Sequence, residues 1–344
     1  MSDSLRDAGP QPSEIRGITD FWAWWATARP GIEAAIAVGD VARAAPDISQ
    51  AVHRIHPGLQ WEIGGQEGLH QLVVTAAGDP ELRSTAARWL LAAPQDRSGW
   101  DFHATRQPDP QALSQVLMVG DQGAKVALAE LSVAVVEDDE SRRLDVAVHH
   151  DHFATLEPTP ALHIAYMALD WALGEDDVER WIGEVTAVPE RPADAIPLAE
   201  LPMAVARLAD RHPRAFALLA GTIDGLPLSA LIQTPLSPVD FPLFDQHIAV
   251  VVPYTTMNPG RLQTGPSAER LDAFDEALTA LMGEDAVFVA AVSHDGRRVF
   301  HYYTDPLNDV AVRIANWQHR WSEGRVEVSA EHDPAWHAVR PFRA

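Results

Sequence analysis

The sequence lacks cysteine and contains a single lysine, Lys125, among its 26 basic residues. The lack of cysteine excludes disulfides, thiolate catalysis and cysteine-ligated zinc. With one lysine, the chain has little scope for Schiff-base chemistry or for lysine-based phosphate binding. A composition rich in arginine and alanine is typical of a GC-rich bacterial genome.

Positive charge is scarce as well. The 49 acidic residues outnumber the 26 basic ones and give a net charge of −23. Non-specific affinity for nucleic acid comes from clustered lysine and arginine, so this balance argues against direct nucleic-acid binding. An acidic chain attracts basic molecules, and we therefore expect a protein partner that is basic.

The sequence has no long hydrophobic run. The longest runs, 248–252 and 286–292, are far shorter than a membrane span, and the start, MSDSLRDAGPQPSEIRG, is polar with no apolar signal-peptide core. We find no glycine-rich phosphate loop, no nucleophile elbow and no dinucleotide fingerprint. We therefore expect a cytoplasmic protein with no membrane partner and no cofactor.

The chain of 344 residues is long enough for two domains, and 11 tryptophans supply material for packed cores. Proline disfavours both helix interiors and inner strands, so a cluster of prolines predicts a linker at 189–212. The cluster consists of Pro189, Pro192, Pro197 and Pro202. The predicted organisation is a flexible tail (1–16), an N-terminal α+β domain (17–188), the linker and a C-terminal domain (213–344).

The C-terminal region has the clearer pattern. Apolar runs and alternation predict strands at 246–252, 286–292, 297–303 and 326–331. Helical spacing predicts one helix between Gly265 and Gly283 and another between Asp305 and Gly324. The resulting β-α-β-β-α-β order is that of a ferredoxin-like sandwich. A further hairpin around Asp224-Gly225 precedes it.

The N-terminal region has a similar composition of elements. Helices are expected around Trp22, at 40–55, at 80–91 and at 161–173, and strands at 59–63, 69–75, 102–106, 126–136, 144–150 and 182–188. We interpret this region as a second sandwich. The predicted fold class is therefore α+β, with two antiparallel-sheet sandwiches.

Two bacterial groups resemble parts of the C-terminal region. The segments Gly221-Thr-Ile-Asp-Gly-Leu-Pro227 and His247-Ile-Ala-Val-Val-Val-Pro253 are similar to the domain-of-unknown-function family numbered 695. The segments around Asp295-Gly296 and Asp333-Pro-Ala-Trp336 resemble the ribonuclease E inhibitor B regulators, which are small acidic ferredoxin-like proteins. Val339 stands where that pattern has a tyrosine. The resemblance implies a regulatory role and no catalytic residues.

A histidine run is the most metal-like feature of the sequence. His149, His150, Asp151 and His152 follow a predicted strand. Because side chains alternate there, His149 and Asp151 should point to one side, and His150 and His152 to the other. At most two of them could bind one ion without further ligands. The alternative is a polar strand end.

Two other clusters have a functional and a structural interpretation. Asp170 and the acids that follow it, through Asp177, can supply paired carboxylates for acid–base work, or they can line a loop beyond a helix that ends at Gly174. Phe21-Trp-Ala-Trp-Trp25 can form an aromatic platform for a ligand, or the core face of a first helix. We favour the structural interpretation of both.

The hairpin turn at Asp295-Gly296 predicts a polar sheet face. With that turn, His294 pairs with Arg297, Val292 with Val299, Ala290 with His301 and Phe288 with Tyr303. The four polar residues His294, Arg297, His301 and Tyr303 then share one face, and Val287, Val289, Ala291, Phe300 and Tyr302 face the helices. The polar face is a candidate binding surface if it is open, and an interdomain interface if the N-terminal domain covers it.

The sequence favours a non-enzymatic regulatory protein that binds a macromolecular partner, because it combines a large negative charge with a resemblance to an inhibitor family. A metal-dependent hydrolase that uses His149 to His152 is the alternative. An immunity-like or self-associating structural protein is a third class.

Overall fold

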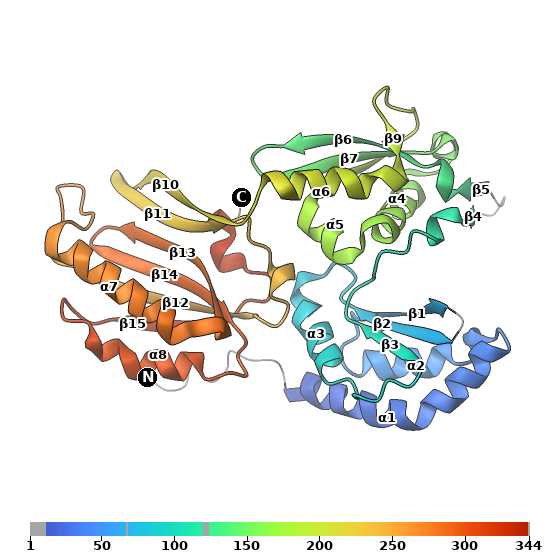
Figure 1. Ribbon diagram of the computed structural model, residues 1–344, viewed down its shortest axis with the longest axis horizontal. Coiled ribbons are helices and arrows are strands. Elements are labelled where there is room, and N and C mark those ends of the chain that lie inside the picture. Colours follow the sequence, from blue (N-terminus) through green and yellow to red (C-terminus); the bar gives the residue numbers. More distant parts are fainter. Residues whose placement is uncertain (1–11, 67, 120–123, 343–344) are drawn as a thin grey trace.

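The computed structural model of the protein describes residues 12–66, 68–119 and 124–342. The described residues form three lobes of helices and sheets; the first and third lobes have one sheet each, and the second has a four-stranded sheet and the two-stranded sheet β4-β5 (Figure 1). The predicted α+β class is confirmed. No helix in these ranges is long and apolar enough to cross a membrane.

In the first lobe, three helices and one small sheet enclose a core rich in aromatic side chains. Its elements are α1 (Pro12–Ala37), α2 (Ala45–His53), β1 (Gln60–Gln66), β2 (Leu69–Thr75), α3 (Arg83–Leu91) and β3 (Trp100–His103). The sheet order is β1-β2-β3, with β3 parallel to β2. Phe21 and Trp25 of α1 are buried against Trp89, Trp100 and Phe102, so the predicted core role of the first helix is confirmed.

The second lobe lies above the first in Figure 1. Its elements are β4 (Val116–Val119), β5 (Ala124–Ala127), β6 (Ser132–Asp138), β7 (Arg143–His149), α4 (Pro158–Leu173), α5 (Glu175–Trp181), β8 (Ile182–Val188), β9 (Ile196–Pro197) and α6 (Leu201–Arg211). The sheet order is β8-β7-β6-β9, and β8 runs parallel to β7. Helices α4 and α6 pack their apolar faces into the core of this lobe.

The predicted domain boundaries differ from the structure in three places. The region 17–188 contains two separate hydrophobic cores rather than one sandwich, and its sheets are mixed rather than antiparallel. The predicted linker 189–212 contains β9 and α6, because Pro202 sits in the first turn of α6 and its apolar residues Leu201, Val205 and Leu208 are buried. Residues 12–16 of the predicted tail belong to α1, and residues 1–11 lie outside the described residues.

The third lobe forms the left-hand side of Figure 1. Its elements are β10 (Ala215–Ile223), β11 (Leu226–Thr234), β12 (Gln246–Pro253), α7 (Gly265–Met282), β13 (Ala286–His294), β14 (Arg297–Thr304), α8 (Val310–Trp317) and β15 (Glu327–His332). The sheet order is β10-β11-β13-β14-β12-β15. The elements from β12 to β15 follow the predicted β-α-β-β-α-β order, and the hairpin β10–β11 extends the sheet at one edge.

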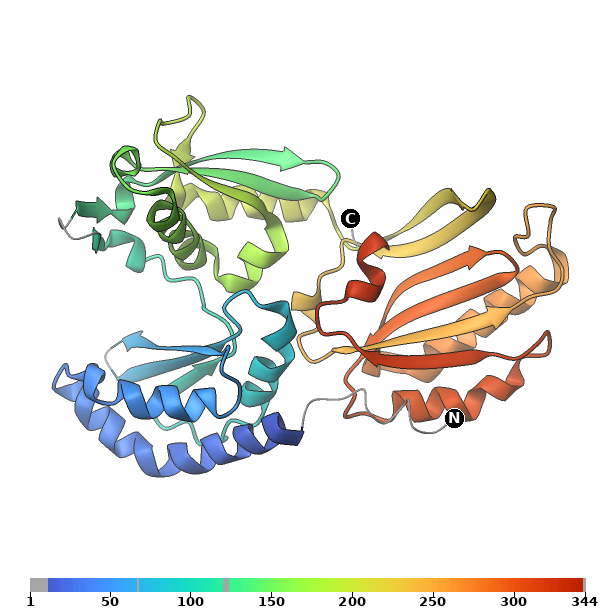
Figure 2. The ribbon, with the colours of Figure 1, turned by 180° about the vertical axis from the view of Figure 1, so that it is seen from behind.

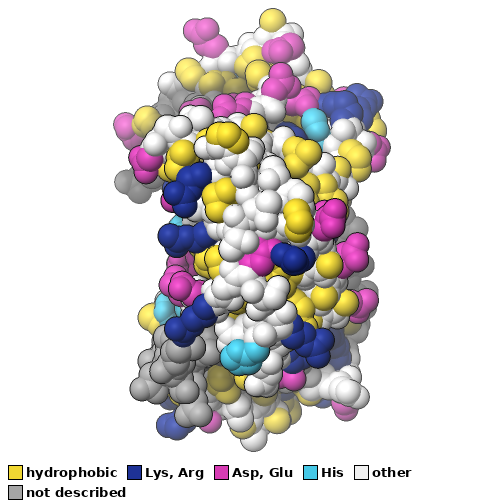
Figure 3. Space-filling view, turned by 90° about the vertical axis from the view of Figure 1, so that its left-hand side faces the viewer, with side chains coloured by type: hydrophobic (Ala, Val, Ile, Leu, Met, Phe, Trp, Pro, Cys, Tyr) yellow, Lys and Arg dark blue, Asp and Glu magenta, His cyan; other side chains and the backbone are white. Residues whose placement is uncertain are grey.

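The two faces of this sheet have different covers. Helices α7 and α8 pack on one face with Phe300 and Tyr302. A C-terminal segment, residues 333–342, packs on the other face through Trp336 and Val339 and can be followed in red in Figure 2. The edge strand β10 has exposed apolar side chains, and Figure 3, which views this end of the molecule, shows hydrophobic side chains at the surface among charged ones.

Ion pairs join the three lobes. Arg88 of α3 is buried and forms a two-pronged contact with Asp245 of the third lobe, at 2.6 and 3.0 Å, and reaches Asp305 at 3.0 Å. Arg83 of α3 contacts Asp176 of α5 at 3.2 Å. Arg180 at the end of α5 contacts Asp240 of the third lobe at 2.8 Å. These contacts hold each lobe against the other two.

Candidate functional site

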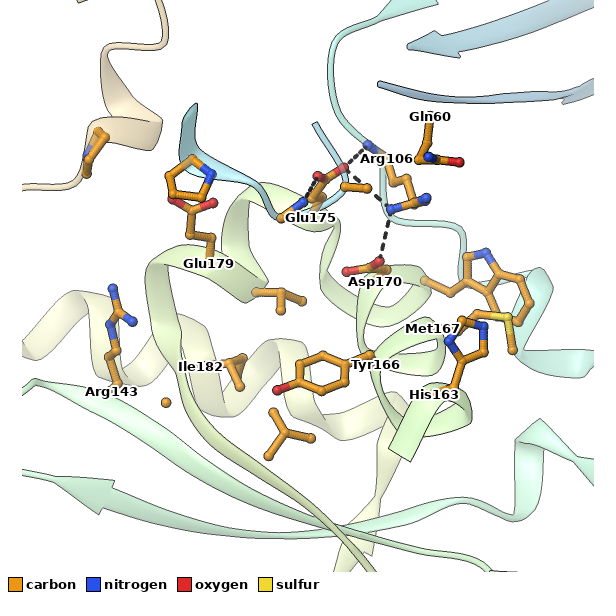
Figure 4. Close-up of a pocket in the computed structure, with 18 of the residues that line it drawn as sticks. Gln60, Arg106, Arg143, His163, Tyr166, Met167, Asp170, Glu175, Glu179 and Ile182 are labelled. Carbon is orange, nitrogen blue, oxygen red and sulfur yellow. Dashed lines mark hydrogen bonds and ion pairs between the residues drawn. The ribbon is translucent and has the colours of Figure 1, made fainter. Parts of the chain in front are cut away.

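A cleft of about 980 Å³ lies where the three lobes meet. Its walls come from β1 and the loop after β2 in the first lobe, from α4, α5 and β8 in the second, and from the C-terminal segment of the third. The volume is at the upper end of the range for pockets that hold small molecules or peptide side chains. We call it the junction cleft (Figure 4).

One face of α4 forms a wall of the junction cleft. His163, Tyr166, Met167, Asp170 and Trp171 line it at the spacing of successive helical turns. The opposite face of α4 carries Ile164, Ala165 and Ala168, which are buried in the core of the second lobe. The same amphipathic pattern that anchors the helix therefore presents a polar and aromatic stripe to the cleft. Tyr166 is 44% exposed there.

Arg106 is the central cation of the junction cleft. It lies in the connection from the first lobe to the second, and its Nε donates to Glu62 at 2.5 Å. Its Nη1 lies 3.6 Å from Asp170 and 3.9 Å from Glu175 (Figure 4). One guanidinium therefore faces three carboxylates from three separate chain segments. If all three are ionised, this end of the cleft has an excess of negative charge.

Glu175 has a structural role at this end of the cleft. Its carboxylate accepts hydrogen bonds from Thr75 Oγ1 at 2.5 Å, from the backbone N–H of Gly78 at 3.0 Å and from that of Arg106 at 3.1 Å. The residue before it, Gly174, has a φ of +81°, a conformation that favours glycine. Glu175 is therefore fully bonded and fastens the first lobe to the second.

Asp170 is the carboxylate that remains available. Among the described residues no hydrogen-bond donor is bound to its side chain, and its nearest cation is Arg106 at 3.6 Å. The pKa of Asp170 is raised from 3.8 to about 6, chiefly by burial; Arg106 opposes the rise, and the negative charges of Glu175 and Glu62 contribute to it. A carboxyl group with a raised pKa in a cleft is a candidate functional group.

Arg143 of β7 lines the junction cleft on the side away from Arg106 (Figure 4). His337 and Arg340 of the C-terminal segment also line the cleft. Arg143 has no carboxylate partner among the described residues, and burial lowers the pKa of its guanidinium. His337 lies 3.8 Å from Glu81 and from Asp333. The cleft is thus acidic near Asp170 and basic near Arg143.

The predicted polar sheet face is not an open binding surface. Tyr303 is fully buried, its ring stacks on Trp336 at 4.1 Å, and its hydroxyl donates to Asp333 at 2.6 Å. His301 lies between His247, whose Nε2 is 3.0 Å from its Nδ1, and Phe342. Neither of the two expected alternatives, an open face or a cover formed by the N-terminal domain, holds at Tyr303 and His301, because the C-terminal segment covers this part of the face.

The other two members of that predicted site, His294 and Arg297, lie at the turn end of the β13–β14 hairpin. His294 Nδ1 bonds the backbone carbonyl of Pro227 at 3.2 Å, and Arg297 is exposed at the start of β14. Three predicted pairs are confirmed: His294 with Arg297, Val292 with Val299 and Ala290 with His301. The predicted pair of Tyr303 with Phe288 was wrong, because a bulge between Phe288 and Ala290 makes Tyr303 pair with Val287.

The bulge also changes which residues face the helices. Val287 and Val289 belong to the core under the C-terminal segment, not to the core under α7 and α8. Ala291, Phe300 and Tyr302 pack against the helices as predicted. One inserted residue turns the first part of β13 over, and local alternation does not reveal such an insertion.

The histidine run lies at the end of β7, away from the junction cleft. His149 Nδ1 bonds the carbonyl of Val188 at 3.1 Å, and its Nε2 lies 3.3 Å from Asp151. The ring of His150 is buried and stacks on His152, with centroids 5.4 Å apart. As predicted, His149 and Asp151 lie together, and so do His150 and His152. The described residues contain no group of three or more His, Cys, Asp or Glu side chains that could hold a metal ion.

Sequence reasoning identified Asp170 and Glu175 as candidate carboxylates but missed Arg106, Glu62 and Tyr166. The one available signal was the helical spacing of Tyr166 and Asp170, which puts both on one face. Comparison with known proteins adds no further candidate, since the sequence matches no protein-family model, no curated protein and no solved structure.

Proposed function

We propose that the protein is a non-enzymatic regulatory protein that binds a basic segment of a protein partner in the junction cleft. The observation that carries the proposal is Asp170, a half-buried carboxylate that lines the cleft and is only partly compensated by Arg106 at 3.6 Å. The cytoplasmic location expected from the sequence is part of this proposal and stays a prediction.

The charges around Asp170 favour a cationic guest. Glu62, Asp170 and Glu175 surround the one guanidinium of Arg106, so a further positive group would complete the charge balance. A charged hydrogen bond to a carboxylate contributes about 1.5–3 kcal/mol. An arginine or lysine of the partner would gain this contact and would relieve the unfavourable burial of Asp170.

The aromatic wall supports the same guest. Tyr166 lies one helical turn before Asp170 on α4 and is 44% exposed, so its ring is accessible from the cleft (Figure 4). A cation held by a carboxylate beside an aromatic ring gains a further ~0.5–2 kcal/mol from the cation–π interaction. The net charge of −23 would also speed the encounter with a basic partner.

The lining of the junction cleft combines charged and aromatic side chains, which suit the binding of a polar peptide segment. The described residues of the lining include carboxylates, arginines, histidines and aromatic rings, and no Ser, Thr, Cys or Lys. The unpaired guanidinium of Arg143 would then receive an acidic or carboxyl-terminal group of the bound segment. The proposed ligand is therefore a short segment whose basic residue enters at Asp170.

A calorimetric titration tests the proposal. The probe is a short peptide of alternating arginine and glycine, and a peptide with glutamate in place of arginine is its control. We expect the basic peptide to bind at low salt and Asp170→Asn to weaken it about ten-fold or more, because a charged hydrogen bond is lost. Asp20→Asn removes an exposed carboxylate from α1 and should leave the affinity unchanged.

A carboxyl NMR titration supplies an independent measurement. A cation beside Asp170 should lower its pKa from about 6 when the basic peptide is bound. Equal weakening by Asp170→Asn and Asp20→Asn, or an unchanged pKa of Asp170 in the complex, would show that the peptide binds through diffuse charge and would refute the proposed site.

A further inference from the structure

A second cavity, of about 570 Å³, lies between the second and third lobes. Four segments meet there: the turn between β6 and β7, the end of α5, the end of α6 with the connection to β10, and residues 235–240. We call it the arginine pocket. Its lining combines charged side chains with the apolar surface of Trp181, Pro213 and Pro235.

The charge of this pocket is opposite to that of the chain. Its described lining residues include four arginines, Arg142, Arg143, Arg180 and Arg214, and one carboxylate, Asp240. The whole sequence has a net charge of −23. The overall negative charge would repel an extended polyanion such as nucleic acid. A local cluster of arginines can still bind one small anion.

The one carboxylate of the lining is already shared. Asp240 accepts from Arg180 at 2.8 Å and from Arg214 at 2.9 Å, and Arg180 also contacts Asp177 at 2.5 Å. Arg142 and Arg143 have no carboxylate partner among the described residues. Burial lowers the pKa of Arg143, with no neighbouring acid to oppose the shift. Two guanidinium groups are therefore left without a counter-ion.

The position of Arg142 is maintained against its backbone preference. Its φ is +55°, a strained conformation that a residue with a Cβ rarely adopts. The turn is built around it, since its N–H donates to the carbonyl of Asp138 at 2.8 Å and Asp138 Oδ1 accepts from the N–H of Glu140 at 3.1 Å. This conformation brings Arg142 to Thr234 of the third lobe at 2.9 Å.

We propose that the arginine pocket binds a small phosphorylated molecule, with the phosphate between Arg142 and Arg143 and the organic part against Trp181, Pro213 and Pro235. The planar fork of arginine matches the oxygen pairs of a phosphate, which carries the charge that two uncompensated guanidinium groups require. The volume exceeds that of a bare ion and is typical of a small-molecule pocket.

This inference goes beyond the peptide-binding role of the junction cleft, although the two cavities share one side chain. Arg143 lines both of them. A phosphate held by Arg143 would withdraw it from the junction cleft and would make that end less basic. The bound molecule would also link the second lobe to the third, because Arg142 belongs to the one and Thr234 to the other.

Calorimetric titration with inorganic pyrophosphate, adenosine diphosphate and citrate tests the proposal. We expect both phosphate probes to bind more tightly than citrate. Arg142→Asn retains a residue that tolerates positive φ and removes the guanidinium, so the fold should be kept and the affinity should fall ten-fold or more. Arg143→Gln should have a similar effect. Arg207→Gln, which removes an exposed arginine of α6 in the same lobe, is the matched control and should leave the affinity unchanged.

The outcomes separate the two proposals. Failure of both phosphate probes to bind the wild-type protein at millimolar concentration would overturn the arginine pocket as a phosphate site, as would equal weakening by Arg207→Gln and Arg142→Asn. Citrate binding as tightly as pyrophosphate would overturn the assignment to phosphate. Asp170→Asn should weaken peptide binding about ten-fold or more without changing pyrophosphate affinity, so either proposal can fail alone.

Discussion

Asp170→Asn should make the protein more stable at pH 7. The carboxyl group is largely buried, its side chain is 18% exposed, and burial raises its pKa from 3.8 to about 6. Such a shift means that the folded protein disfavours the ionised form, which is the form present at neutral pH. Asparagine has nearly the same shape and no charge, so it removes the unfavourable term. Arg106 retains Glu62 and Glu175 as partners.

The magnitude follows from the size of the shift. Each pKa unit corresponds to ~1.4 kcal/mol, so a rise from 3.8 to about 6 sets an upper limit of about 3 kcal/mol. The folded state takes up a proton near pH 6 and the unfolded state near pH 4. Between these values the folded state binds more protons, and the contribution of Asp170 to stability falls as the pH rises. We expect the variant to gain about 1–3 kcal/mol at pH 7 and almost nothing at pH 4.

Urea unfolding of both proteins from pH 4 to pH 7 measures this difference. Subtracting the two curves removes the contribution of the other titrating groups, which the variants share. Asp20→Asn, in an exposed part of α1, should give a difference near zero at every pH. A variant that is less stable than the wild type at pH 7, or a difference that does not change with pH, would refute the account of Asp170. The predicted gain would indicate a carboxylate retained for function at the expense of stability.

Three further predictions concern the contacts that hold the lobes and the sheet cover. Arg88→Ala leaves Asp245 buried without its partner and should lower the unfolding free energy by about 3–5 kcal/mol, measured by urea unfolding; adding Asp245→Asn should restore part of it. Trp336→Ala removes the ring that stacks on Tyr303, should cost about 3–5 kcal/mol, and should expose the C-terminal segment to proteinase K, a protease of broad specificity, as mass spectrometry of the fragments will show; an unchanged digestion pattern would contradict that role. Burial lowers the pKa of His301 to about 4, so its contribution to stability is present above pH 6.5 and is lost as the pH falls toward 4; His301→Gln should remove this pH dependence from urea unfolding, and an unaltered slope would contradict it.

Local sequence patterns predicted most of the strands and part of the strand pairing of the third lobe. Alternation and the Asp295-Gly296 turn predicted the pairing of His294 with Arg297 and of Ala290 with His301, because a two-residue turn sets the register of a hairpin. The same pattern did not predict the pairing of Tyr303 with Val287. A bulge near Phe288 depends on packing across the sheet, and the alternation of a single strand contains no sign of it.

A cluster of prolines does not by itself identify a linker, because α6 lies within the predicted linker 189–212. A proline in the first turn of a helix removes no internal hydrogen bond, so Pro202 begins α6 rather than extending a linker. The apolar spacing of Leu201, Val205 and Leu208 was the better guide, since all three are buried. Whether a proline ends or begins a helix depends on the residues that follow it.

The sequence by itself determined the α+β class, the aromatic core face of α1 and most strands of the third lobe, because each depends on spacing within a short segment. Only the tertiary structure decided that Arg106 meets Glu62 and Asp170, that residues 333–342 cover the sheet, and that Arg142 and Arg143 share a pocket. These are contacts between distant segments. They arise when three lobes with separate cores are brought together, and the periodicity of one segment carries no information about the partner it will meet.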